Sequence, residues 1–129
     1  MLPIFNNLYV QQFLLVVTLI IGAWFNACAT YYNKISGLNQ SFMKIYAISV
    51  GYAIIEYMIK VPGIYYFGKS VNSIDTAMLI LICMFGATAL YTVTVLKEPI
   101  SINSIVTICV FILVYMVHIY IKRKYNIKN

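Results

Sequence analysis

The chain has 129 residues, of which 63% are hydrophobic and 9% charged, with a formal net charge of +6. Soluble domains carry roughly 25% charged residues, so the composition excludes an ordinary soluble domain and indicates a membrane protein with room for one compact unit. We expect no nucleic-acid partner, because the basic residues form no patch interleaved with aromatic side chains.

The first predicted helix covers about residues 10–32, within an N-terminal stretch of 33 residues that has no charged side chain. At about 1.5 Å per residue it is long enough to cross a hydrocarbon core of roughly 30 Å. Ala27-Cys28-Ala29 is similar to a signal-peptide cleavage site. The positively charged n-region of such signals is missing and three further spans follow, so we expect the helix to be retained.

The second predicted helix, residues 42–61, has the shortest apolar stretch. Between Lys44 and Lys60 lie 15 residues, one of which is Glu56. Both lysine stems can extend and bring their ammonium groups to the headgroups. Pro62-Gly63 predicts the end of this helix, because proline disfavours helical geometry in the residue before it. Glu56 is then expected nearer to the membrane surface than to the midplane.

The third predicted helix, residues 76–96, lies between Asp75 and Lys97, and the Asp75 carboxylate is suited to cap its N-terminus. The fourth, residues 99–121, begins at Pro99, which sacrifices no helix hydrogen bond in the first turn. The short connection between the two predicts an antiparallel hairpin.

The sequence therefore predicts an all-α fold: one integral membrane domain of four transmembrane helices with a basic tail at residues 122–129. An even number of spans places both termini on one side. Six basic residues share that side and three lie on the other, which favours a cytoplasmic C-terminus. The six are Lys60, Lys69, Lys122, Arg123, Lys124 and Lys128, and the three are Lys34, Lys44 and Lys97. Without the tail the count is two against three, which leaves dual topology open, and the sequence does not identify the membrane.

Glu56 is the acid that most needs an explanation, because an ionised group at the centre of a span costs about 2.5–3.5 kcal/mol. Ser49, Tyr52 and Lys60 share its helical face, a polar stripe that should face protein or a water-filled cavity. Two interpretations stay open. Glu56 and Lys60 form a structural ion pair one turn apart, or Glu56 exchanges a proton or cation. Burial favours the uncharged acid, whereas Lys60 favours the carboxylate.

Other polar and aromatic side chains are candidates for a binding cavity. On the first helix Thr18, Gly22 and Asn26 share one face, for which close helix packing is the simplest explanation. Trp24 and Asn26 could instead line a cavity, with the Trp24 ring offering its π face to a cation. Tyr91 on the third helix could reach across to a carboxylate.

Neither an enzyme nor a cofactor is expected. No Ser/His/Asp, Cys/His or paired-carboxylate set occurs at a suitable depth, and the single histidine, His118, lies near the basic tail and is expected at the interface. Cys28, Cys83 and Cys109 are isolated within apolar runs and predict neither a disulfide framework nor a metal site.

Two segments carry a family resemblance. In the first, an acid and an aromatic residue precede a Val-Pro break, in Ile55-Glu56-Tyr57-Met58-Ile59-Lys60-Val61-Pro62. The second is a hydrophobic-x-Glu-Pro-hydrophobic turn, Leu96-Lys97-Glu98-Pro99-Ile100-Ser101. Together with Ala23-Trp24-Phe25 they resemble a short, four-helix branch of the drug/metabolite transporter superfamily. The resemblance covers nearly the whole chain and implies a helical membrane bundle whose theme is solute transport.

The chain also departs from that pattern. Lys60 stands where the branch usually has Gln, and Gly63 follows Pro62 where a polar or basic residue is usual. The distantly similar small multidrug resistance proteins carry their coupling acid in the first helix, where this chain has none. Their proton/drug exchange therefore cannot be transferred to Glu56.

Two hypotheses follow. In the first, the protein is a small transporter that works as a homodimer in the lipid bilayer, with Glu56 as the coupling or solute-binding carboxylate. Tyr52, Trp24, Asn26 and Tyr91 then shape the cavity for a solute that the sequence does not identify. In the second, it is a membrane interaction protein in which Glu56 and Lys60 are a structural pair.

Overall fold

The computed structural model describes residues 7–35 and 38–125, and within them the chain forms four long α-helices and one 3-10 turn. The helices are α1 (Leu8–Tyr31), η2 (Tyr32–Lys34), α2 (Phe42–Phe67), α3 (Ser73–Thr94) and α4 (Ile102–Lys124). All four α-helices are long and apolar enough to cross a bilayer. The predicted all-α fold is confirmed, and the chain is an integral multi-pass membrane protein.

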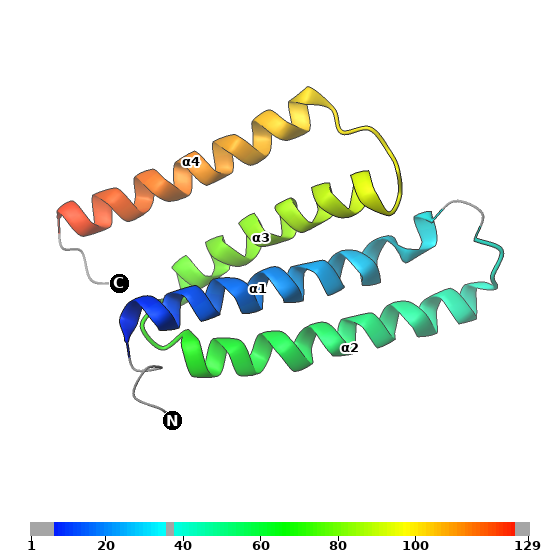
Figure 1. The fold of residues 1–129 in the computed structure, drawn as a ribbon, viewed down its shortest axis with the longest axis horizontal. Coiled ribbons are helices and arrows are strands. Elements are labelled where there is room, and N and C mark those ends of the chain that lie inside the picture. Colours follow the sequence, from blue (N-terminus) through cyan, green and yellow to red (C-terminus); the bar gives the residue numbers. More distant parts are fainter. Residues whose placement is uncertain (1–6, 36–37, 126–129) are drawn as a thin grey trace.

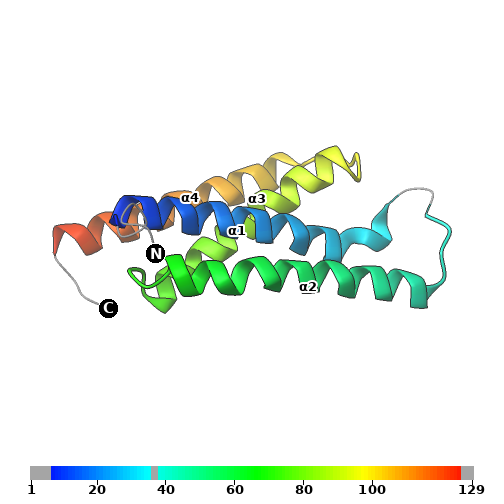
Figure 2. The same ribbon diagram turned by 60° about the horizontal axis from the view of Figure 1, so that its bottom comes forward.

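Helix α1 is the centre of the bundle. It packs against α2 on one side and α3 on the other, while the backbone of α4 approaches α3 alone among the described elements (Figures 1 and 2). Leu15, Leu19, Ala23 and Ala27 recur every fourth residue along α1 and are buried, so they form one stripe at this centre. The alanines let neighbouring helices approach closely, as is usual in membrane bundles.

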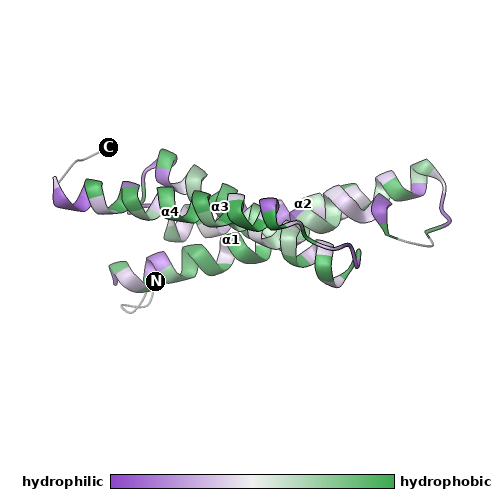
Figure 3. Ribbon diagram, turned by 90° about the horizontal axis from the view of Figure 1, so that it is seen from above, coloured by the Kyte–Doolittle hydropathy of each residue, from purple (hydrophilic) through white to green (hydrophobic). Residues whose placement is uncertain are grey.

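The outer surface is apolar. Among the described residues, α4 has no buried side chain and α2 has only Glu56 and Gly63. Figure 3 shows hydrophobic helices with hydrophilic residues gathered at the C-terminal end of α4 and at the connections. Such a surface is unsuited to water and suited to lipid, whose hydrocarbon core can solvate it.

The prediction that α2 ends at residue 61 is wrong. The helix continues through Pro62 to Phe67. Within a bilayer, ending the helix at Pro62 would leave several backbone groups without hydrogen-bond partners, and neighbouring helices make an internal proline tolerable. The neighbour here is α1. Gly63 is buried against it so closely that a Cβ at Gly63 would overlap the Thr18 side chain.

The ends of α3 and α4 also differ from the prediction. Asn72, not Asp75, caps α3, and its Oδ1 accepts the Asp75 backbone N–H at 2.8 Å. Helix α4 begins after Pro99, because Ser101 supplies the cap by accepting the Ser104 N–H at 3.2 Å.

Residues 95–101 connect α3 to α4 and contain the Lys-Glu-Pro segment. Lys97 has a φ of 55°, and exposed Glu98 donates its backbone N–H to Thr92 O at 3.0 Å. The two helices run antiparallel, as expected (Figure 1). Of the basic tail, Lys122–Lys124 belong to α4, and Lys128 lies outside the described residues.

Candidate functional site

Glu56 lies near the middle of α2 and not one and a half turns from the end of its helix. It is within two residues of the midpoint of α2, because the helix extends beyond Pro62. Its neighbour across the seam is Gly22, which lies close to the centre of the α1 span Leu8–Lys34. A Cβ at Gly22 would be 3.6 Å from Lys60 Cβ and 3.9 Å from Glu56 Cγ, so the two helices meet closely at this level.

The Glu56 carboxylate is buried and has two donors. Its side chain is 5% exposed, Oε1 accepts from Lys60 Nζ at 3.0 Å, and Oε2 accepts from Asn26 Nδ2 at 3.2 Å. The ion pair expected from the i,i+4 spacing is therefore present. Asn26 of α1, which the sequence analysis placed with Glu56 among the candidate cavity residues, supplies the second donor. We refer to Glu56, Lys60 and Asn26 as the midplane cluster.

The three predicted aromatic residues are not gathered around Glu56. Trp24 and Tyr91 pack edge to face at the α1–α3 seam, with ring centroids 5.5 Å apart. Tyr52, one turn before Glu56, has its ring 6.4 Å from Phe25 and 6.3 Å from the ring of Tyr32. These aromatic contacts occupy the seams on either side of α1.

A second buried acid forms a cluster that the sequence did not predict. Asp75 at the start of α3 is 2% exposed. His118 Nε2 lies 2.7 Å from its Oδ1, and Lys122 Nζ donates to its Oδ2 at 2.6 Å. An ionised carboxylate only accepts, so His118 donates as well. Asp75, His118 and Lys122, here termed the inner-end cluster, join α3 to α4.

Two signals in the sequence point to the inner-end cluster when combined. His118 and Lys122 are spaced i,i+4 and so share a face of α4. The antiparallel hairpin brings the end of α4 to the start of α3, where Asp75 lies. Asp75 is therefore a partner for both side chains and not the cap of α3, which is Asn72.

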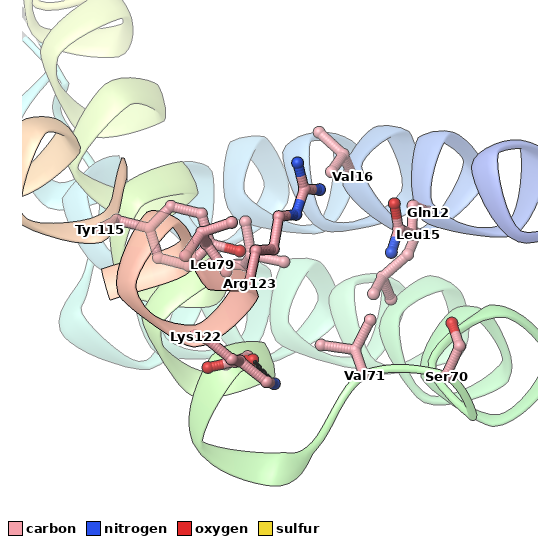
Figure 4. A pocket seen from close by; sticks show the side chains of 11 residues that line it. Gln12, Leu15, Val16, Ser70, Val71, Leu79, Tyr115, Lys122 and Arg123 are labelled. Carbon is pink, nitrogen blue, oxygen red and sulfur yellow. Dashed lines mark hydrogen bonds and ion pairs between the residues drawn. The ribbon is translucent and has the colours of Figure 1, made fainter. Parts of the chain in front are cut away.

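The inner-end cluster borders a cavity of about 490 Å³, shown in Figure 4. Its walls come from α1, the α2–α3 connection, α3 and α4. The lining residues are Gln12, Leu15, Val16, Ser70, Val71, Asp75, Leu79, Tyr115, Ile119, Lys122 and Arg123. A cavity of about 460 Å³ lies at the opposite end, between α3 and the start of α4, and is lined by Thr88, Thr92 and Thr107 among others. Neither cavity is lined by Glu56 or by the predicted aromatic residues.

Comparisons with protein-family models, curated proteins and solved structures find no match. The midplane cluster offers a carboxylate and an amide to a cation or proton near the middle of α2, provided that Lys60 can withdraw. The inner-end cluster borders a cavity at the end of the bundle whose lining also includes the cation Arg123.

Proposed function

We propose that the protein is a small membrane transporter in which Glu56 binds a proton or a solute cation. The supporting observation is the near-complete burial of this carboxylate at the middle of α2. Ionisable groups at such a depth are costly and typically mark substrate or proton pathways. The resemblance of the Glu56–Pro62 segment to the short branch of the drug/metabolite transporter superfamily supports the same proposal.

In this proposal Lys60 competes with the transported cation. Its side chain is 17% exposed and flexible, so its ammonium group can leave Glu56 while the stem stays packed. Asn26 can keep its hydrogen bond to the carboxylate during the exchange. Separation of α1 from α2 would admit the solute past Tyr52, while the packing of Trp24 against Tyr91 keeps α1 in contact with α3.

We further propose that two copies act together and that the C-terminus is cytoplasmic. Transporters of this style are built from two repeats around a midplane site, and this chain supplies one set of four helices. The positive residues at the end where α4 finishes favour the cytoplasmic side.

The alternative function is that of a non-transporting membrane interaction protein. The observation that favours it is the Lys60–Glu56 distance of 3.0 Å within a single helix, which gives the carboxylate a partner without any solute. A buried ion pair of this kind can often be replaced by apolar side chains without loss of stability. Function would then survive removal of both charges.

Flux measurements in proteoliposomes separate the two functions. Proton movement is read with an encapsulated pH-sensitive dye under an imposed gradient, in the presence of guanidinium, ethylammonium or tetraphenylphosphonium. Glu56→Gln removes a charge-assisted contact to the cation that is worth about 1.5–3 kcal/mol. It should therefore reduce the cation-dependent proton flux about tenfold or more. Glu98→Gln, a matched change at an exposed acid, should leave flux unchanged.

The variant with both Glu56→Met and Lys60→Met provides the decisive comparison. The transport proposal expects it to be folded and inactive, since no carboxylate remains. Wild-type flux in this variant, or no flux in the wild-type protein with any of the three cations, would contradict the proposal and favour the interaction protein.

A further inference from the structure

The cavity beside the inner-end cluster combines an unpaired cation with apolar walls. Lys122 is neutralised by Asp75, which is almost fully buried. The Arg123 guanidinium forms no hydrogen bond or ion pair with a residue of the described ranges, and in Figure 4 it extends into the cavity. The cavity wall thus has one cation in excess over its acid.

The rest of the lining limits what can bind to this cation. Leu15, Val16, Leu79 and Ile119 form apolar walls next to it. An inorganic anion would leave these walls in contact with water, whereas an anion attached to a hydrocarbon chain would cover them. The volume of about 490 Å³ is within the range of roughly 300–1,000 Å³ that is usual for ligand pockets.

The position of the cavity in the membrane adds a further constraint. It lies where α1 begins and α4 ends (Figures 1 and 4). Basic residues at the ends of membrane-spanning helices are expected at the level of the lipid headgroups. The backbone of α4 lies close to that of α3 but not to that of α1, and side chains of both α1 and α4 line the cavity. Basic pockets between transmembrane helices at this level are suited to anionic lipid headgroups.

We propose that this cavity binds an anionic phospholipid. The Arg123 guanidinium donates hydrogen bonds to the lipid phosphate, because its planar arrangement of N–H groups matches two phosphate oxygens. The part of one acyl chain nearest the headgroup lies against Leu15, Val16 and Ile119. The lipid then bridges α1 and α4, two helices without direct backbone contact. This proposal involves no residue of the midplane cluster and does not depend on transport.

Native mass spectrometry of the full chain tests the proposal. The protein is reconstituted with equal amounts of phosphatidylglycerol and phosphatidylcholine, extracted in detergent and weighed with its retained lipids. The wild-type protein should retain phosphatidylglycerol preferentially, and Arg123→Gln should lower that preference about tenfold, the effect of losing one charge-assisted contact. Lys124→Gln is the matched control, because Lys124 is the next residue, carries the same charge and does not line the cavity.

Two further arms test the site itself and the acyl chain. Val16→Phe narrows the apolar wall while Arg123 is intact, and it should also reduce retention of phosphatidylglycerol. Soluble glycerol phosphate should not displace the lipid, because it has no chain. Equal losses in Arg123→Gln and Lys124→Gln would overturn the proposal in favour of diffuse surface charge. Displacement by glycerol phosphate would overturn it in favour of a site for free phosphate.

Discussion

At the scale of single residues, the two buried acids are stabilised in different ways. Glu56 is paired with Lys60 of its own helix and with one neutral amide from α1, so its ion pair forms without any change in helix packing. Asp75 accepts from His118 and Lys122, both on another helix. The charge of Glu56 can therefore be rearranged within α2, whereas that of Asp75 holds two helices together.

Gly63 should be the glycine least tolerant of substitution. A methyl group there would overlap Thr18 across the α1–α2 seam, so Gly63→Ala should destabilise the protein by about 1–3 kcal/mol. Gly51 is the control, since a Cβ at that position has no atom within 4 Å and Gly51→Ala should be neutral or slightly stabilising. Unfolding of both variants in a series of denaturing detergent mixtures measures the difference. Equal stabilities would show that α1 and α2 are not in close contact at Gly63.

At the scale of elements, the attachment of α4 depends on few groups. Its backbone approaches α3 alone, and the inner-end cluster supplies the ion pairs between the two helices among the described residues. Asp75→Asn removes the charge that His118 and Lys122 share. Hydrogen exchange in residues 115–125 should then become about tenfold faster, corresponding to about 1.4 kcal/mol, while α1 and α2 keep their protection. Glu98→Gln is a matched acid-to-amide control, and equal exchange in both variants would contradict this role of Asp75.

The sequence was sufficient for the number of helices but not for all of their ends or contacts. Four apolar runs, each near the length of a bilayer, predicted four spans. The sequence predicts the end of α2 too early, because Pro62 locally disfavours continuation of the helix. This preference is outweighed by the cost of breaking a helix in lipid and by the packing of Gly63 against Thr18. The Glu56–Lys60 pair followed from helical spacing within one segment. The contacts of Glu56 with Asn26, and of Asp75 with His118, require the relative placement of two helices, which periodicity does not provide.

At the scale of the whole molecule, α1 starts and α4 finishes at the same end of the bundle, and the α2–α3 connection lies at that end too (Figure 1). The connection contains Lys69, and the end of α4 contains Lys122–Lys124. Green fluorescent protein fused after Asn129 should be fluorescent in a bacterial inner membrane, and alkaline phosphatase fused there should be inactive, since the positive residues favour the cytoplasm. Activity of the phosphatase alone would reverse the assigned orientation. Partial signals from both reporters would indicate dual topology, which the small charge bias outside the tail allows.

The packing of Trp24 against Tyr91 also gives the molecule an intrinsic optical probe. Trp24 is the only tryptophan among 129 residues, and its ring meets that of Tyr91 at an interplanar angle of 66° across the α1–α3 seam. Emission excited at the red edge of the absorption band therefore comes from one place in the fold. Glu56 lies on the opposite side of α1, at the α1–α2 seam, and contacts neither ring. Replacing both Glu56 and Lys60 by Met leaves the net charge unchanged, so a shift of the emission in that variant would report a change in the packing of α1 against α3.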